Sequence, residues 1–156
     1  VEIFHGAHGR FESNATVRTF VPFRINDEPY LLAGFQCTPL VKFPIQSLTG
    51  EEKVRGTTLA ELGNRNTPLD MFVYEKGGKN FLLMSNDRRG VMKISTDDVE
   101  RKDGITERIQ GLAGQEYETI ESMKNVEQMD KLNEQFVVLL SKNESGSLDV
   151  STVALP

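Results

Sequence analysis

Two histidines stand three residues apart near the start of the chain, in the segment His5-Gly-Ala-His8. Imidazole nitrogens are common ligands of zinc, copper and haem iron, so His5 and His8 are candidate metal ligands. On an extended strand, residues i and i+3 point to opposite faces, and metal binding therefore requires the glycines to bend the segment. No third histidine and no nearby cysteine completes a coordination shell. The alternative is a hydrogen-bonded structural or surface pair.

A second group of candidate residues is rich in arginine and asparagine. Guanidinium forks match carboxylate and phosphate groups bidentately, so these residues are predicted to bind an anionic ligand. The alternative is that their charges are solvated or pair with acidic neighbours. The candidate ligand-binding residues are Arg10, Asn64, Arg65, Asn66, Asp87, Arg88 and Arg89.

No catalytic residue stands out in the sequence, so whether the protein is an enzyme stays open. Cys37 is the only cysteine, which excludes an intrachain disulfide and a thiolate-rich metal cluster. A nucleophilic cysteine needs a base, and none lies beside it in sequence, although the fold could bring His8 near. A buried free cysteine is the commoner case. Phosphate-binding loops, dinucleotide fingerprints and nucleophile elbows are absent from the sequence.

Charge and hydropathy exclude two classes of partner. The formal net charge is -5, whereas binding to nucleic acid or to an acidic membrane needs a field of lysine and arginine. No apolar run approaches the roughly 20 residues that span a bilayer. We therefore expect no nucleic-acid partner and no membrane span.

Three segments of the chain follow one plan, with a period of about fifty residues. Each contains an apolar strand, a short polar turn, a second apolar strand, a polar loop and a third strand. We expect a single all-β unit over 1–156, with repeats at about 18–67, 68–125 and 126–156. Residues 1–17 would then supply the outer strand and loop of a preceding sheet.

Alternation and turn residues place the strands. The fourth strand of the second repeat is either Ile105 to Gln110 or Tyr117 to Ile120, and Thr119 to Leu132 could instead form a helix. The other expected strands are Val1–His5, Thr19–Ile25, Tyr30–Gln36, Leu40–Ile45, Val54–Leu62, Leu69–Glu75, Phe81–Ser85, Val91–Ser95, Val126–Leu132, Phe136–Ser141 and Leu148–Ala154.

The strands divide into about three four-stranded antiparallel sheets, and the third sheet lacks its fourth strand. The expected fold is an incomplete ring of β-propeller blades, because closed propellers have typically four to eight blades. An open arc needs another protein chain, or the rest of a longer precursor, to cover its sheet faces and strand edges. The alternative is a β-sandwich or barrel in which all strands pair within one domain.

The blocks YLLAGFQCTPLVKFPI, FLLMSNDRRGVMKIST and FVVLLSKNESGSLDVSTVAL carry a resemblance to the β-propeller superfamily. The nearest likeness is to diverged repeats of secreted or periplasmic propellers, including quinoprotein-like ones. The resemblance implies a periplasmic or secreted protein that binds partners or cofactors at one end of the ring. The start at Val1, without methionine, suggests a processed or truncated chain.

Two functions follow from these expectations. The first is a protein-binding or ligand-binding assembly module that acts through a loop-rich face carrying the arginines and histidines. The alternative is a propeller subunit or fragment of a periplasmic oxidoreductase. Its quinone, haem or metal ion would be shared with a partner chain.

Overall fold

The chain folds entirely into β-strands and loops. The computed structural model describes residues 1–156, which contain four antiparallel sheets, no α-helix and one 3₁₀ turn, η1 (Ile45–Ser47). No helix in the structure is long and apolar enough to cross a membrane. The all-β prediction is confirmed. Of the two alternatives for Thr119 to Leu132, the structure has the strand, β12 (Val126–Lys131), and no helix.

The strands group in chain order. A small hairpin pairs β1 (Ile3–His5) with β2 (Arg10–Glu12). The first sheet has the order β10-β6-β5-β4-β3, the second β11-β9-β8-β7, and the third β12-β13-β14. The bounds are β3 (Val17–Ile25), β4 (Glu28–Phe35), β5 (Pro39–Pro44), β6 (Thr57–Leu62), β7 (Pro68–Lys76), β8 (Lys79–Asn86), β9 (Gly90–Ser95), β10 (Leu112–Gly114), β11 (Tyr117–Thr119), β12 (Val126–Lys131), β13 (Phe136–Lys142) and β14 (Leu148–Ala154).

Two-residue turns close the first hairpin of the first and second sheets. Asn26 and Asp27 have φ of 49° and 64°, and Gly77 and Gly78 have φ of 62° and 76°. Positive φ at both central residues matches the right-handed twist of the flanking strands, and these residue types adopt it readily. The turns fix the register of β3 with β4 and of β7 with β8.

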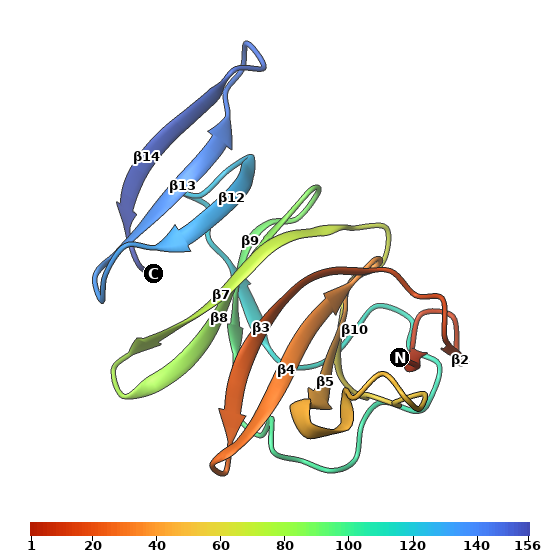
Figure 1. The fold of residues 1–156 in the computed structure, drawn as a ribbon. Coiled ribbons are helices and arrows are strands. Elements are labelled where there is room, and N and C mark those ends of the chain that lie inside the picture. The colour runs from red at the N-terminus through yellow and green to blue at the C-terminus, as the bar shows by residue number, and fades with distance from the viewer.

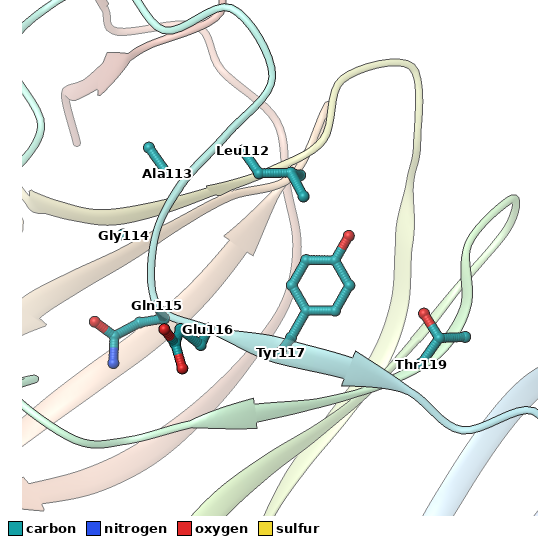
Figure 2. Close-up of a pocket in the computed structure, with 7 residues that line it drawn as sticks. All are labelled: Leu112, Ala113, Gly114, Gln115, Glu116, Tyr117 and Thr119. Carbon is teal, nitrogen blue, oxygen red and sulfur yellow. The ribbon is translucent and has the colours of Figure 1, made fainter.

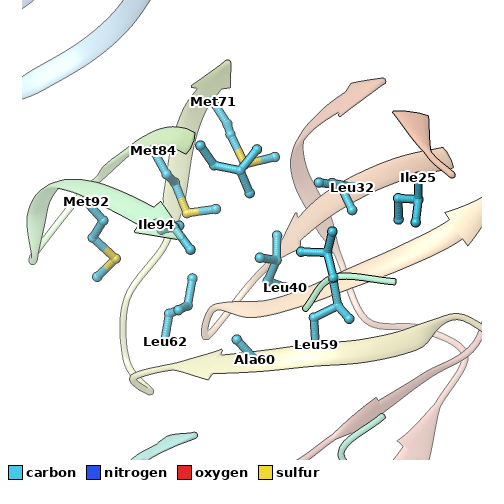
Figure 3. Close-up of a cluster of buried hydrophobic side chains, with 12 residues drawn as sticks. Ile25, Leu32, Leu40, Leu59, Ala60, Leu62, Met71, Met84, Met92 and Ile94 are labelled. Atoms are coloured by element: carbon cyan, nitrogen blue, oxygen red, sulfur yellow. The ribbon is translucent and has the colours of Figure 1, made fainter. Parts of the chain in front are cut away.

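The three sheets stack on one another through apolar faces. The first strands of the sheets, β3, β7 and β12, lie side by side (Figure 1). One cluster of buried side chains fills the space between the first and second sheets, with Leu32, Leu40 and Leu59 facing Met84 and Met92 (Figure 3). None of the sheets is closed into a barrel.

A second apolar cluster joins the second sheet to the third. Phe72, Tyr74 and Leu83 of the second sheet meet Val137 and Leu139 of the third. Both faces of the second sheet are therefore buried. This explains the nearly continuous apolar run in β8, since a sheet with one face in water would alternate.

The fourth strand of the second sheet is β11, which pairs with β9. Of the two predicted segments, the structure therefore selects the one at Tyr117, and Ile105 to Gln110 forms no strand. Just before β11, β10 adds a fifth strand to the first sheet by pairing with β6. No strand is predicted at Leu112–Gly114 from the sequence, so β10 is a finding of the structure.

The long loop between β9 and β10 is held by buried polar groups. The Lys42 Nζ donates to the backbone oxygens of Val99 and Arg101, at 2.7 and 2.6 Å. The Arg101 guanidinium donates to Gln115 and to the backbone oxygen of Leu59. Burial lowers the pKa of Lys42, and the nearby Arg101 charge lowers it further. These contacts fix the loop along the outer edges of the first and second sheets.

Gly114, the last residue of β10, provides a test of how closely this strand packs on β6. A Cβ atom at Gly114 would lie 1.9 Å from the backbone oxygen of Leu59, and φ there is +84°. Gly146 has the same φ, but its nearest neighbour would be 3.9 Å away. We predict that Gly146→Ala costs about 1–2 kcal/mol, the strain of a left-handed residue, and that Gly114→Ala costs clearly more. Urea unfolding of both variants measures the difference, and equal losses of stability would contradict the close packing of β10.

Candidate functional site

The histidine segment forms the tight turn of the β1–β2 hairpin. The backbone N–H groups of His8 and Gly9 both donate to the backbone oxygen of His5, at 3.1 and 2.8 Å. Gly9 has φ of 69°, a left-handed conformation that glycine adopts without steric cost. The two imidazole rings lie 3.8 Å apart, centroid to centroid. The bend that metal binding requires is therefore present.

The carboxylate of Glu12 lies against both imidazoles. Its Oε2 is 3.0 Å from the Nδ1 of His5, and its Oε1 is 2.9 Å from the Nδ1 of His8. The Arg10 Nε donates to the same Oε1 at 2.9 Å. The candidate ligand atoms of His5, His8 and Glu12 all lie within 4.8 Å of one another. Glu12 is not among the predicted ligands, because the sequence predicts one outer strand and a loop over residues 1–17 and not a hairpin that folds back.

The electrostatics keep this carboxylate ionised. Burial acts to raise the pKa of Glu12, but hydrogen bonds from Arg10, His5 and His8 outweigh it and hold the pKa at about 2. Burial lowers the pKa of His5, and this effect outweighs the hydrogen bond that His5 donates to Glu12, which acts to raise it. At neutral pH the cluster therefore combines an anionic carboxylate with a neutral His5 imidazole, the protonation states that metal coordination uses.

A second carboxylate, Glu61 of β6, lies directly behind the turn. The N–H of Gly6 donates to its Oε1 at 2.6 Å, and a Cβ at Gly6 would lie 2.9 Å from the Glu61 side chain. Burial raises the pKa of Glu61 to about 7, against the lowering effect of the Gly6 and Ala7 backbone N–H groups. Its hydrogen bond to Gly6 places Glu61 against the peptide that joins the two histidines.

Two buried atoms beside the turn have no hydrogen-bond partner. They are the Nε2 of His5 and the Oε2 of Glu61. Only 4% of the His5 side chain is exposed, and Glu61 is 1% exposed. A buried polar atom without a partner costs free energy, so this place in the fold needs an explanation beyond packing.

Hydrogen bonds bring together two of the predicted ligand-binding loops, β6–β7 and β8–β9. The Asn66 side chain is buried, donates to Asn86 at 2.8 Å and accepts the backbone N–H of Arg88 at 3.2 Å. The Asp87 carboxylate accepts the backbone N–H of Thr67 at 2.7 Å. Asn66 and Asp87 therefore have a structural role in joining the loops.

The arginines of these loops remain exposed. The side chains of Asn64, Arg65, Arg88 and Arg89 face solvent, and neither Arg65 nor Arg89 forms an ion pair. Arg10 contacts none of these residues through a hydrogen bond or ion pair, since its partner is Glu12. The structure thus places Arg10 in the histidine cluster, and ligand binding by the other loop residues stays a prediction.

Cys37 lies in the β4–β5 turn and is partly buried. Cys37 and Thr38 both have φ of 66°, and the Thr38 hydroxyl donates to the backbone oxygen of Gly63. No histidine or carboxylate forms a hydrogen bond with the thiol, so the arrangement offers no general base.

An open pocket of about 520 Å³ is lined by residues 112–119, where the chain crosses from β10 to β11. Figure 2 shows Gln115 and Tyr117 pointing away from one another along this segment. The Gln115 side-chain amide donates hydrogen bonds to the backbone oxygens of Ser95 and Asp97. The pocket therefore has no group of convergent acids, bases or nucleophiles, unlike the β1–β2 hairpin.

Comparisons with known proteins identify no relative. A scan of protein-family models finds no match, and searches of curated proteins and of solved structures find no significant match either. The function must therefore be argued from the geometry of this chain.

The buried carboxylate predicts a pH dependence of stability. The pKa of Glu61 is about 7 in the folded chain and near 4.5 in an unfolded one, so the folded state binds more protons between these values. Ionisation of Glu61 therefore lowers the free energy of unfolding as pH rises, by about 2 kcal/mol between pH 5 and pH 8.

The variant Glu61→Gln isolates this effect, because the amide oxygen can still accept the Gly6 N–H but does not ionise. The lowered pKa of His5 acts in the opposite direction, since its contribution is lost as pH falls below 6.5, but it is common to both proteins. Urea unfolding should show that wild type loses stability relative to Glu61→Gln as pH rises. A difference that stays constant with pH would show that Glu61 is not a buried acid.

Proposed function

We propose that the chain is an arc of a β-propeller that acts as a binding and assembly module, and that the third sheet docks a further antiparallel sheet. The observation that carries this proposal is an apolar sheet face open to solvent. The outer face of the third sheet carries the apolar residues Phe136, Val138, Leu140, Leu148 and Val150, bordered on the same face by Gln128, Asp130, Lys142, Thr152 and Ala154.

The exposure of this face is unusual for such side chains. Val150 is 73% exposed and Leu148 is 56% exposed. The opposite face of the same strands is covered by the second sheet, through Val137 and Leu139. Apolar residues on both faces are typical of a sheet that is covered on both sides, and a large exposed apolar patch marks a site of interaction.

The packing inside the chain indicates what the partner is. Apolar faces of antiparallel sheets meet twice, between the first and second sheets and between the second and third. In Figure 1 the third sheet lies at the end of the molecule opposite the N-terminus. A further sheet with an apolar face would repeat the same packing there. The third sheet also has three strands, so the edge of β14 is unpaired.

The other end of the arc presents a matching surface. The outer face of the first sheet is partly covered by the β1–β2 hairpin, which packs Ile3 against Phe35 and Phe43. Phe20 of the same sheet is still 59% exposed. The hairpin lies beside β6, where the Thr58 hydroxyl donates to the backbone oxygen of Phe4. A further sheet that packed on the outer face of the first sheet would therefore lie next to the hairpin. In the proposed arc, the hairpin would stand where the outer strands of a preceding blade lie.

The partner is therefore a polypeptide that presents an antiparallel sheet with an apolar face. A second copy of this chain presents such faces at both ends of its arc and serves as the probe. Heterologous contacts of this kind close into a ring when the rotation between sheets allows it. The structure offers no comparable apolar surface among the arginine loops, so the sheet faces carry the proposed assembly.

Sedimentation velocity of the chain over a range of concentrations tests the proposal. We expect reversible self-association that weakens tenfold or more in the variants Leu140→Lys and Val150→Lys, because a lysine ammonium cannot be buried unpaired against an apolar sheet. The free energy of unfolding of Val150→Lys should change by no more than about 1 kcal/mol, since this residue faces solvent in the isolated chain.

Leu112→Lys provides the matched control. Leu112 is 58% exposed, but it lies on β10 at the outer edge of the first sheet, away from the third sheet. This variant should self-associate as wild type does. A chain that stays monomeric at all concentrations, or one whose association is unaffected by Leu140→Lys and Val150→Lys, would refute docking on this face.

A further inference from the structure

We propose that the β1–β2 hairpin is a metal site in which His5, His8 and Glu12 bind a divalent first-row transition-metal ion. Zn²⁺ is the ion that best suits this donor set. The inference goes beyond assembly, because the hairpin and the outer face of the third sheet are separate parts of the molecule.

The spacing of the donor atoms fits coordination to one ion. Zinc binds imidazole nitrogen and carboxylate oxygen at about 2.1 Å in tetrahedral geometry, so neighbouring ligand atoms lie about 3.4 Å apart. The two nitrogen-to-oxygen distances in the cluster are the hydrogen-bond distances of 3.0 and 2.9 Å, so the donor atoms have to spread only slightly to admit an ion. Both rings turn the Nδ1 atom toward the same carboxylate, so an ion placed between them meets three donors after a small adjustment.

The chemistry of the donors selects the class of metal. Two imidazoles and one carboxylate suit zinc and iron(II), whereas magnesium and calcium prefer oxygen ligands alone. Three protein ligands leave a further position for water or for a partner's ligand, as in catalytic rather than structural zinc sites. His8 is partly exposed, at 46% of its side chain, so an ion could enter from solvent on that side.

A second buried carboxylate beside the turn supplies independent support. Glu61 is 1% exposed, its Oε1 accepts the Gly6 N–H between the two histidines at 2.6 Å, and its Oε2 has no partner. The Nε2 of His5 is also buried without a partner, and coordination at Nδ1 would make this atom a donor instead of an acceptor. A bound cation would compensate the negative charge that Glu12 and Glu61 place around the turn.

Glu61 acts here as a positioning residue. Its hydrogen bond to the Gly6 N–H holds the peptide between the two histidines, and so fixes the bend that brings their rings together. Arg10 has the opposite effect, since its guanidinium occupies Oε1 of Glu12 and places a positive charge beside the ion.

Zn²⁺ titration of the metal-free chain by isothermal calorimetry tests the site. We expect one ion per chain, and an affinity at least tenfold weaker in His8→Ala and in Glu12→Gln. The variant Glu12→Gln keeps the shape of the side chain and removes its charge. His5 is buried, so its replacement could unfold the hairpin. Thermal unfolding of each variant without metal confirms that the fold is retained.

Two further variants separate coordination from general electrostatics. Arg10→Ala should bind Zn²⁺ at least as tightly as wild type, because it removes a competing cation. Glu118→Gln alters an exposed carboxylate on β11, outside the hairpin, and should leave the affinity unchanged. In the Co²⁺-loaded chain we expect visible absorption bands that His8→Ala weakens or shifts.

Three outcomes would overturn the proposal. They are the absence of saturable one-to-one binding at 100-fold molar excess of Zn²⁺ over chain, equal affinity of wild type and Glu12→Gln, and equal affinity of wild type and His8→Ala. The metal titration does not depend on self-association, so either proposal can fail without the other.

Discussion

The structure depends on one constraint, that an antiparallel sheet with two apolar faces must be covered on both sides. The second sheet satisfies it within the chain, because the first sheet packs on one face and the third sheet on the other. Burying a Leu, Val, Phe or Met side chain is worth roughly 1.5–3 kcal/mol, so these two interfaces supply much of the driving force for folding. The third sheet is covered on one face only, and its exposed apolar face is the basis of the proposed assembly.

The two ends of the stack of sheets differ in how their outer faces are covered. At the N-terminal end, the β1–β2 hairpin folds over the outer face of the first sheet and buries Ile3 among Phe35 and Phe43. At the C-terminal end, Leu148 and Val150 stay exposed. The hairpin has to turn sharply to lie on the sheet, and that turn is what brings the two imidazoles together. The same hairpin turn therefore both covers the first sheet and assembles the candidate metal centre.

The polar groups of the molecule are concentrated where sheets do not cover one another. Lys42 and Arg101 secure the long loop at the outer sheet edges by donating to backbone oxygens. Asn66 joins two loops through a buried side chain. Both groups have their hydrogen-bond partners within the chain. The His5 and Glu61 side chains differ in keeping buried atoms without partners, as the Ser85 hydroxyl in β8 also does. Only beside the hairpin do such atoms accompany a cluster of candidate metal ligands.

The sequence by itself determined the β class, most strand positions and the succession of three antiparallel sheets along the chain. Strand periodicity and turn residues such as Asn26-Asp27 and Gly77-Gly78 are local signals, so they can be read without the fold. The sequence also marked His5 and His8 as candidate ligands. It did not show that β10 joins the first sheet or that β11 is the fourth strand of the second, because strands of three residues carry too little periodicity.

Only the tertiary structure decided which functional residues lie together. Glu12 reaches the histidines through the hairpin turn, and Glu61 reaches the same turn from 55 residues away. Arg10, which the sequence analysis grouped with the loop arginines, instead contacts Glu12. Such contacts depend on register and on packing between distant segments, and no local pattern encodes them. The exposed apolar face of the third sheet is likewise a property of the assembled stack, since alternation along β13 and β14 does not reveal which face a neighbour covers.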